Sequence, residues 1–180
     1  MKDIMNLTYS NFIDKTTLEF LDTVDIEKEE DYVIISMKLF SETNKIIDQY
    51  NKNISGYGKY PRIRELTSIQ VARLIMKFYD FKRINVSSES HKSYRLGFYN
   101  KAGKRKGLYS ISKEAIKDKI YSLVSIDSKV SVNKIYYFIE CFSDKVNLTL
   151  DKDLIPVNNG VFDYKNGKLL EFSPNYVFFN

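Results

Sequence analysis

The clearest capacity for chemistry lies in the segment NKAGKRKG, residues 100–107, which concentrates positive charge in a few positions. The runs SYRLGFYN and GLYSI on either side favour β structure, so Tyr94–Ile111 is predicted to be a hairpin with the charges at its turn. A projecting cationic turn binds phosphates and releases their counterions, which predicts contact with a nucleic-acid backbone. The cationic side chains of the turn are Lys101, Lys104, Arg105 and Lys106.

The distribution of charge along the chain favours the same interpretation. Residues 1–31 hold three Lys against nine Asp and Glu, whereas residues 73–107 hold ten Lys and Arg against two acidic residues. This asymmetry indicates one surface that faces a polyanion; the alternative is an ordinary solvated surface rich in lysine. Three further cations of the middle segment are expected to support the turn, namely Arg83, Lys92 and Arg95.

Aromatic residues on the predicted hairpin have two readings. They could stack on unpaired bases, as aromatic side chains do in proteins that bind single strands. Alternation along a hairpin more often directs such rings into a core, and the sequence leaves both readings open. The residues concerned are Tyr94, Phe98, Tyr99 and Tyr109.

Motifs for catalysis are weak in this sequence. It has no GxxxxGK[ST] loop, and one histidine (His91) with one cysteine offers no zinc site. Asp151 and Asp153 have the spacing of a two-metal site, but they precede a strand in a polar turn. The run FDYKNGKLLEFS is similar to a nuclease hairpin, but Ser173 stands where the lysine should be. We therefore expect no metal, no cofactor and no catalysis by these residues.

Composition limits the setting of the chain. Of its 180 residues 43% are hydrophobic, which is enough for a packed core, and no run approaches the ~20 apolar residues of a membrane span. Cys141, the single cysteine, lies between apolar neighbours and is predicted to be a small buried side chain. A lone cysteine favours a reducing compartment. We expect a cytoplasmic protein, bacterial or in a phage-infected cell, without membrane contact.

The fold class predicted from periodicity is α+β, mainly helical with two small β-hairpins. Apolar spacing predicts helices over 8–22, 29–53, 66–81, 110–125 and 131–146. The third can be capped by Thr67 or Ser68, and with the basic hairpin it suggests a winged-helix-like middle segment. Two Asn-Gly steps predict a terminal hairpin over 154–172. We expect an acidic helical segment over 1–65 and an α+β domain over 66–180.

The terminal residues IPVNNGVFDYKNGKLLEFSPNYVFFN resemble a pattern in phage and plasmid primase–helicases and their poxviral relatives. There a domain ends in NGxxDxxTGxxxxxxPxxxxTN before a superfamily 3 helicase. Asn166 replaces a frequent Thr, and Phe179 takes the penultimate place. Upstream, YRLGFYNKAGKRKGLYS is similar to the family's hairpin without its tryptophan, and the resemblance covers about residues 70–180. The matching motif residues are Asn159, Gly160, Asp163, Gly167, Pro174 and Asn180.

The resemblance implies a replication protein whose ATP-driven motor acts in cis or in trans and forms a hexameric ring. It carries no catalytic residue into these positions. One hypothesis is a DNA-binding accessory domain, led by the basic turn and indifferent to base sequence. The alternative is an interaction module that assembles the ring or recruits a primase or initiator without touching DNA. A stand-alone winged-helix repressor is disfavoured, because the helix over 68–80 is too apolar to read bases.

Overall fold

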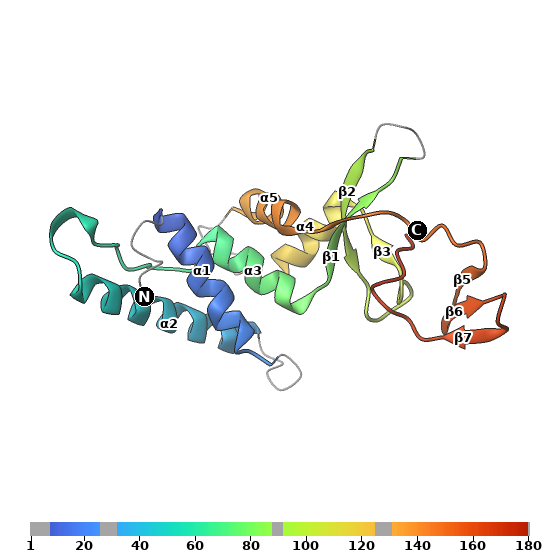
Figure 1. The fold of residues 1–180 in the computed structure, drawn as a ribbon, viewed down its shortest axis with the longest axis horizontal. Helices are drawn as coiled ribbons and strands as arrows, with labels where there is room; N and C mark the ends of the chain where they lie inside the picture. The colour runs from blue at the N-terminus through green and yellow to red at the C-terminus, as the bar shows by residue number, and fades with distance from the viewer. Residues whose placement is uncertain (1–7, 26–31, 88–91, 125–130, 180) are drawn as a thin grey trace. The chain divides into compact units, whose positions relative to one another are not determined.

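The computed structural model describes residues 8–25, 32–87, 92–124 and 131–179 of the chain. The predicted α+β, mainly helical class is confirmed. The chain forms two compact units, one from residues 1–78 with 123–138 and the other from 79–122 with 139–180 (Figure 1). The division expected at residue 65 and the likeness to a winged helix stay predictions.

The first unit is helical. It contains α1 (Tyr9–Asp22), α2 (Tyr32–Lys52), a 3-10 turn η2 (Gly56–Gly58), α3 (Ser68–Phe78) and the first part of α5 (Val132–Phe142). α1 packs on both α2 and α3. Two apolar clusters lie between these helices, and their buried members are Phe12, Ile13, Ile47 and Ile63 in one and Leu21, Ile35 and Leu74 in the other.

Polar side chains fix the connection from α2 to α3. Asn51 accepts a hydrogen bond from the backbone N–H of Tyr60 and donates one to its carbonyl, both at 2.8 Å. Asn44, two turns earlier on α2, binds both backbone groups of Ile63 in the same way. Thr67 then caps α3 in a reciprocal pair of hydrogen bonds with Gln70, which confirms one of the two predicted caps.

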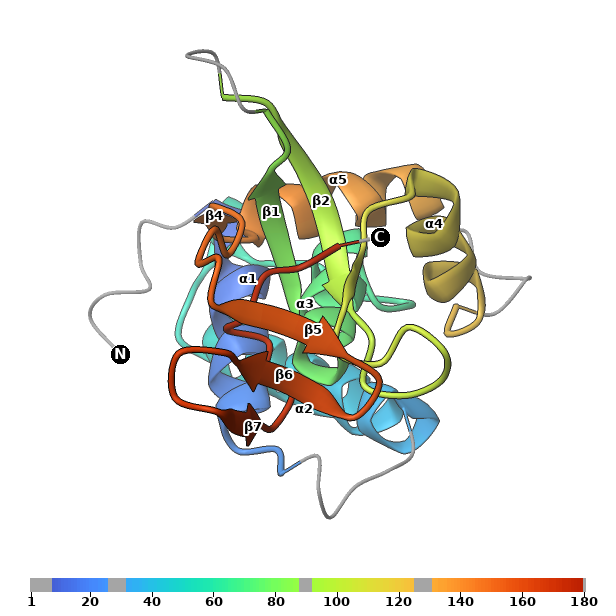
Figure 2. The same cartoon turned by 90° about the vertical axis from the view of Figure 1, so that its right-hand side faces the viewer.

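The second unit is built on a four-stranded sheet in the order β3-β2-β1-β4. The strands are β1 (Phe81–Asn85), β2 (Tyr94–Tyr99), β3 (Tyr109–Ser110) and β4 (Lys145–Val146). β1, β2 and β3 are antiparallel neighbours, and β4 lies parallel to β1. Figure 2 shows β1 between β2 and β4. α4 (Lys113–Tyr121) packs on β2. The hairpin predicted over Tyr94–Ile111 is present, but within a larger sheet.

The register of the sheet places its core. Directly opposed residues of antiparallel strands project from the same face, so Ile84, Tyr99 and Tyr109 share one face. They form a buried cluster with Val177 of the C-terminal segment. Gly97 lies on this face, where an added Cβ would come within 2.9 Å of Ile84 Cδ1. Glycine at this position lets the Ile84 side chain lie across β2.

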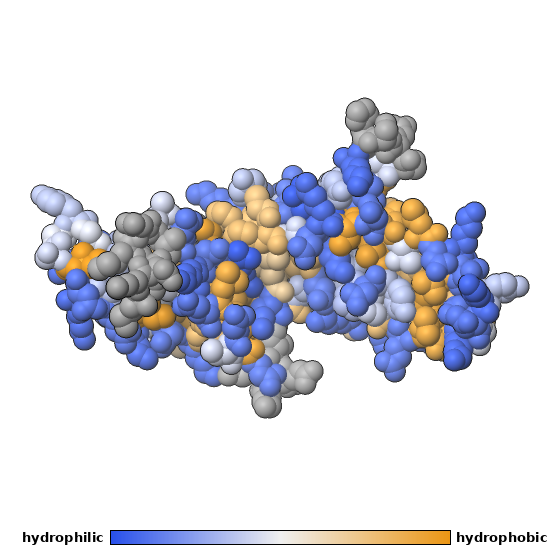
Figure 3. Space-filling model, in the orientation of Figure 1, coloured by the Kyte–Doolittle hydropathy of each residue, from blue (hydrophilic) through white to orange (hydrophobic). Residues whose placement is uncertain are grey.

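A second sheet, in the order β5-β6-β7, follows near the C-terminal end of the chain. Its antiparallel strands are β5 (Leu154–Val157), β6 (Gly160–Asp163) and β7 (Lys168–Leu170). Ile155, Phe162 and Leu169 lie opposite one another across it, and Ile155 and Leu169 are exposed. Figure 3 shows apolar side chains, in orange, gathered over this part of the second unit.

The turn predicted at Asn159-Gly160 is wrong in detail. Val157 pairs with Gly160, so the turn residues are Asn158 and Asn159, and Gly160 begins β6 without a positive φ. The physical reason for glycine is close approach, because a Cβ there would run into the backbone oxygen of Leu170. At the other Asn-Gly step Gly167 does adopt a left-handed φ of 62°.

The C-terminal segment is fastened to the first sheet of this unit. The Pro174 carbonyl accepts hydrogen bonds from the Tyr109 hydroxyl at 2.8 Å and from Lys82 Nζ at 2.9 Å. The Tyr109 N–H donates to the Phe178 carbonyl at 2.7 Å. Thr149 and Val177 exchange two further hydrogen bonds. Residues 174–178 are therefore held between β3 and the segment after β4.

Three expectations about local structure are corrected. The helix predicted over 66–81 ends at Phe78, and that over 131–146 ends at Phe142, because Phe81 and Lys145 begin β1 and β4, which pair with each other. Cys141 is exposed rather than buried. The buried residues of α5 include Ile135 and Ile139, and Cys141, two residues after Ile139, lies on the opposite side of the helix.

Candidate nucleic-acid interface

The basic turn is an ordered loop between β2 and β3. Asn100 closes it: its N–H and its side-chain Nδ2 both donate to the Leu108 carbonyl, at 3.0 and 2.6 Å. The Asn100 Nδ2 also reaches Ser110 Oγ at 3.0 Å, and the Asn100 carbonyl accepts from the Gly107 N–H. The loop ends are therefore clamped together, and residues 101–106 are all exposed.

Two glycines set the shape of this loop. Gly103 and Gly107 have φ of 80° and 85°, a conformation that other residues adopt only with strain. A Cβ added to Gly103 would have no neighbour within 4 Å, whereas a Cβ added to Gly107 would strike the Phe172 ring. The loop is therefore open at its tip and packed against the C-terminal segment at its base.

The four cations of the loop differ in what they contact. Lys104 and Arg105 have no ion-pair partner within the described residues and are exposed. Lys101 Nζ lies 3.4 Å from Asp80 Oδ2, with both side chains largely exposed. Lys106 Nζ lies 6.0 Å from the centroid of the Phe172 ring. Among the described residues, one carboxylate, that of Asp80, competes for a cation of the loop, and that cation is Lys101.

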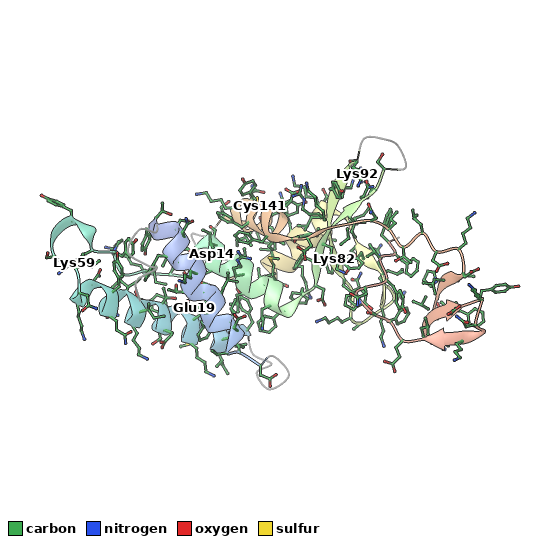
Figure 4. The ribbon with its side chains drawn as sticks, viewed as in Figure 1. Asp14, Glu19, Lys59, Lys82, Lys92 and Cys141 are labelled. Atoms are coloured by element: carbon green, nitrogen blue, oxygen red, sulfur yellow. The ribbon has the colours of Figure 1, made fainter. Side chains whose placement is uncertain are left out.

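The three supporting cations do not gather at the loop. Lys92 precedes β2, whereas the loop follows it, so they lie at opposite ends of that strand (Figure 4). Arg83 is opposite Leu96, and Arg95 is opposite Ile84, which places the two arginines on opposite faces of the sheet. Arg83 is partly buried, and its Nε has no hydrogen-bond partner in the described part of the chain.

Sequence reasoning passed over two lysines near these strands. Lys82 of β1 lies opposite Gly97 of β2. Its Nζ donates a hydrogen bond to the Pro174 carbonyl and helps to anchor the C-terminal segment. Lys145 of β4 lies over the Tyr94 ring at 5.2 Å from its centroid. The aromatic and β-branched residues of the run FKRINV are the signal that could have predicted β1 and so placed Lys82 on a strand.

The aromatic residues of the hairpin mostly serve the core. Tyr99 and Tyr109 are 6% and 1% exposed, with ring centroids 5.4 Å apart, so their faces are not open to a base. Phe98 is half-buried beside Phe81, at 6.2 Å between centroids. Burial raises the pKa of the Tyr109 hydroxyl above its ordinary value, and nearby Asp80 and Tyr99 raise it further. Tyr109 is thus a neutral donor to Pro174.

The motif residues of the terminal segment have structural roles. The Asp163 carboxylate accepts hydrogen bonds from Asn166 Nδ2 at 2.6 Å and from the Asn166 N–H at 3.0 Å, which closes the turn between β6 and β7. These bonds favour the ionised form and lower the pKa of Asp163. Gly160, Gly167 and Pro174 have the backbone roles given above, and Asn159 lies in the turn before β6. Asn180 is outside the described residues.

The excess of positive charge lies in the second of the two units. The segments 79–122 and 139–180 contain 15 Lys and Arg against 10 Asp and Glu, whereas the remainder of the chain contains 13 of each. The net charge of +5 therefore belongs to the unit that carries the basic loop. Among the described residues no three His, Cys, Asp or Glu side chains are placed to hold a metal ion. None of the described helices has the length and apolar character needed to span a bilayer.

Comparison with known proteins identifies the family of the chain. A search of curated proteins gave no match. The family model described as D5 N terminal like matches residues 37–180, which begins within α2 and so reaches further upstream than the resemblance seen in the sequence. The chain therefore belongs to the D5 N-terminal-like family, the domain that precedes superfamily 3 helicases in phage, plasmid and poxvirus primase–helicase proteins.

Proposed function

We propose that this domain binds DNA for a primase–helicase, with the loop over 101–106 in contact with phosphates. The observation that carries the proposal is the exposed pair Lys104 and Arg105, unpaired within the described residues, on a loop clamped by Asn100. A clamped loop loses little conformational freedom on binding, so its cations act at low entropic cost. Family membership supports a setting in DNA replication.

Binding of this kind does not depend on base sequence. Lysine and arginine on a loop tip reach phosphate oxygens, which are the same at every step of the strand. Affinity then falls linearly on a log–log plot against salt, with a slope of about 0.9 per phosphate contact for duplex and about 0.7 for single strands. The motor to which the domain would deliver the strand acts in cis or in trans, as a homo-oligomeric ring.

The test is a charge reversal with a matched control. Lys104→Glu with Arg105→Glu is expected to weaken DNA binding at least roughly tenfold, since each phosphate contact is worth on the order of 1 kcal/mol. The control is Lys165→Glu with Lys168→Glu, which changes the net charge equally at exposed positions of the β6–β7 region. Fluorescence anisotropy of labelled oligonucleotides across a salt series gives both affinity and slope.

The salt slope distinguishes local contact from general attraction. Loss of two phosphate contacts should reduce the slope by between about 1.4 and 1.8, while the control leaves it nearly unchanged. If both double variants weaken binding equally, the loop has no special role. If neither changes it, the domain does not bind DNA through these cations.

A second candidate function, an interaction module for ring assembly or for a primase or initiator, has a separate observation in its favour. Ile155 and Leu169 are exposed on one face of the second sheet, and Val33, Ile34 and Met37 are exposed on α2. Exposed apolar groups that cluster on a surface are typical of protein contacts. Light scattering over a concentration series tests it: oligomers that form without any DNA binding would favour this function.

A further inference from the structure

An open groove of about 380 Å³ lies in the second unit, next to the base of the basic loop. It is lined almost wholly by apolar side chains. Phe178 and Phe179 are its aromatic lining residues, and Leu150, which also lines it, is 79% exposed. The other residues that line it are Leu108, Leu148, Thr149, Pro156 and Val177.

The backbone joins this groove to the loop. Leu108, which lines the groove, follows Gly107 directly, and its N–H donates to the Arg105 carbonyl at 3.0 Å. The Tyr109 N–H donates to the Phe178 carbonyl, and Tyr109 forms a bridge with Phe179, so the two phenylalanines run beside Leu108. The cations and the aromatic groove are therefore neighbours, separated by only a few residues of a clamped chain.

The groove offers apolar contact rather than hydrogen-bond readout. The Thr149 N–H donates to the Val177 carbonyl, and the Val177 N–H donates to Thr149 Oγ1 at 2.8 Å. These donors along the groove are already used within the protein. An aromatic and aliphatic surface accepts any base by its flat face, which is how proteins bind single strands without sequence preference.

We propose that the groove receives an unpaired base of single-stranded nucleic acid while the loop holds the adjoining phosphates. This proposal rests on the proposed function and specifies that the nucleic acid bound is single-stranded. In a duplex the bases are paired and stacked, so a base enters a pocket only after it has been pulled out of the helix. The neighbouring Lys104 and Arg105 favour a polyanion over an apolar protein segment as the occupant.

The experiment compares oligonucleotides of equal charge. A thymidine dodecamer, an abasic dodecamer with the same phosphates, and a blunt duplex are bound to the full chain in anisotropy titrations. The thymidine strand is expected to bind about fivefold more tightly than the abasic strand, or better, because stacking is lost in the latter. Leu150→Ala and Phe179→Ala should each reduce that ratio towards one and leave the affinity for the abasic strand unchanged.

Controls separate this proposal from the one on which it rests. Leu169→Ala removes an exposed leucine of β7 that does not line the groove and should leave the ratio intact. Thermal unfolding of each variant checks that the fold is kept. Lys104→Glu with Arg105→Glu should weaken both strands equally, since it removes phosphate contacts only.

The outcomes are distinct. Equal binding of the thymidine and abasic strands by the unchanged protein overturns the base groove, and the loop stands if the charge reversal still weakens both. The base groove is also overturned if neither Leu150→Ala nor Phe179→Ala changes the ratio of the affinities for the thymidine and abasic strands. If Leu150→Ala leaves the ratio unchanged but abolishes self-association in light scattering, the groove is a protein contact and the proposal fails. Unchanged binding of every strand by the charge-reversed variant would remove the proposed function itself.

Discussion

Tyr109 holds the C-terminal segment through both its side chain and its backbone. Its side chain is 1% exposed, and its hydroxyl donates to the Pro174 carbonyl at 2.8 Å. Tyr109→Phe keeps the ring and removes this bond, while Lys82 Nζ still reaches the same carbonyl. The free energy of unfolding should therefore fall by only about 1 kcal/mol, which urea denaturation can measure.

Tyr109→Phe should also change how the free energy of unfolding depends on pH. Burial raises the folded-state pKa of Tyr109 above the value of about 10 in an unfolded chain. Its contribution to stability is therefore complete below about pH 10 and is lost as the pH rises further. Unfolding measured between pH 8 and 11 should show a shallower alkaline loss for Tyr109→Phe than for the unchanged protein. Tyr121→Phe, at a position 61% exposed, is the control, and equal steepness in all three proteins would contradict the argument.

At the scale of the loop, the two left-handed glycines form a matched pair for a second prediction. Gly103→Ala meets only backbone strain, on the order of 1 kcal/mol, because its surroundings are empty. Gly107→Ala meets the same strain and the Phe172 ring as well. Gly107→Ala should therefore be clearly the more destabilising in urea unfolding. Equal costs would mean that Phe172 does not support the base of the loop.

Local signals predicted the helical elements and the basic hairpin well. α1 begins with the cap Thr8, α3 with Thr67 and α4 with Ser112, each in a sequence with helical apolar spacing. β1 and β4 were not predicted, for a physical reason. Both faces of β1 are partly buried, so its apolar and polar residues do not alternate, and β4 has two residues whose pairing depends on a strand about 60 residues earlier.

The candidate site divides in the same way. The cations of the loop are close together because they are close in sequence. The order of residues in this short segment was therefore enough to predict that they form one cluster. Arg83, Lys92 and Arg95 depend on the register and direction of β1 and β2, which fix the face and the end of the strand that each occupies. The groove beside the loop combines Leu108, Leu148 and Phe179, which only the docking of the C-terminal segment brings together. No pattern of spacing could have indicated it.

At the scale of the whole molecule, the chain passes more than once between its two compact units. The chain crosses from one compact unit to the other after residues 78, 122 and 138, so neither unit is a continuous segment. The family match over 37–180 includes parts of both. Residues 123–138 lie in the sequence between the two segments of the positively charged unit, but they fold with the helical unit.

This interleaving leads to the last prediction. A fragment over 79–180 keeps the loop, the groove and both sheets, but it removes the helices with which the first part of α5 clusters. Ile135, 0% exposed in the chain, would lose that burial, and exposed apolar area costs about 25 cal/mol per Å². Circular dichroism melting should show the fragment unfolding at a lower temperature and less cooperatively than the full chain, with stronger binding of an apolar dye. Cooperative melting of 79–180 at the temperature of the full chain would show that the charged unit folds without its partner helices.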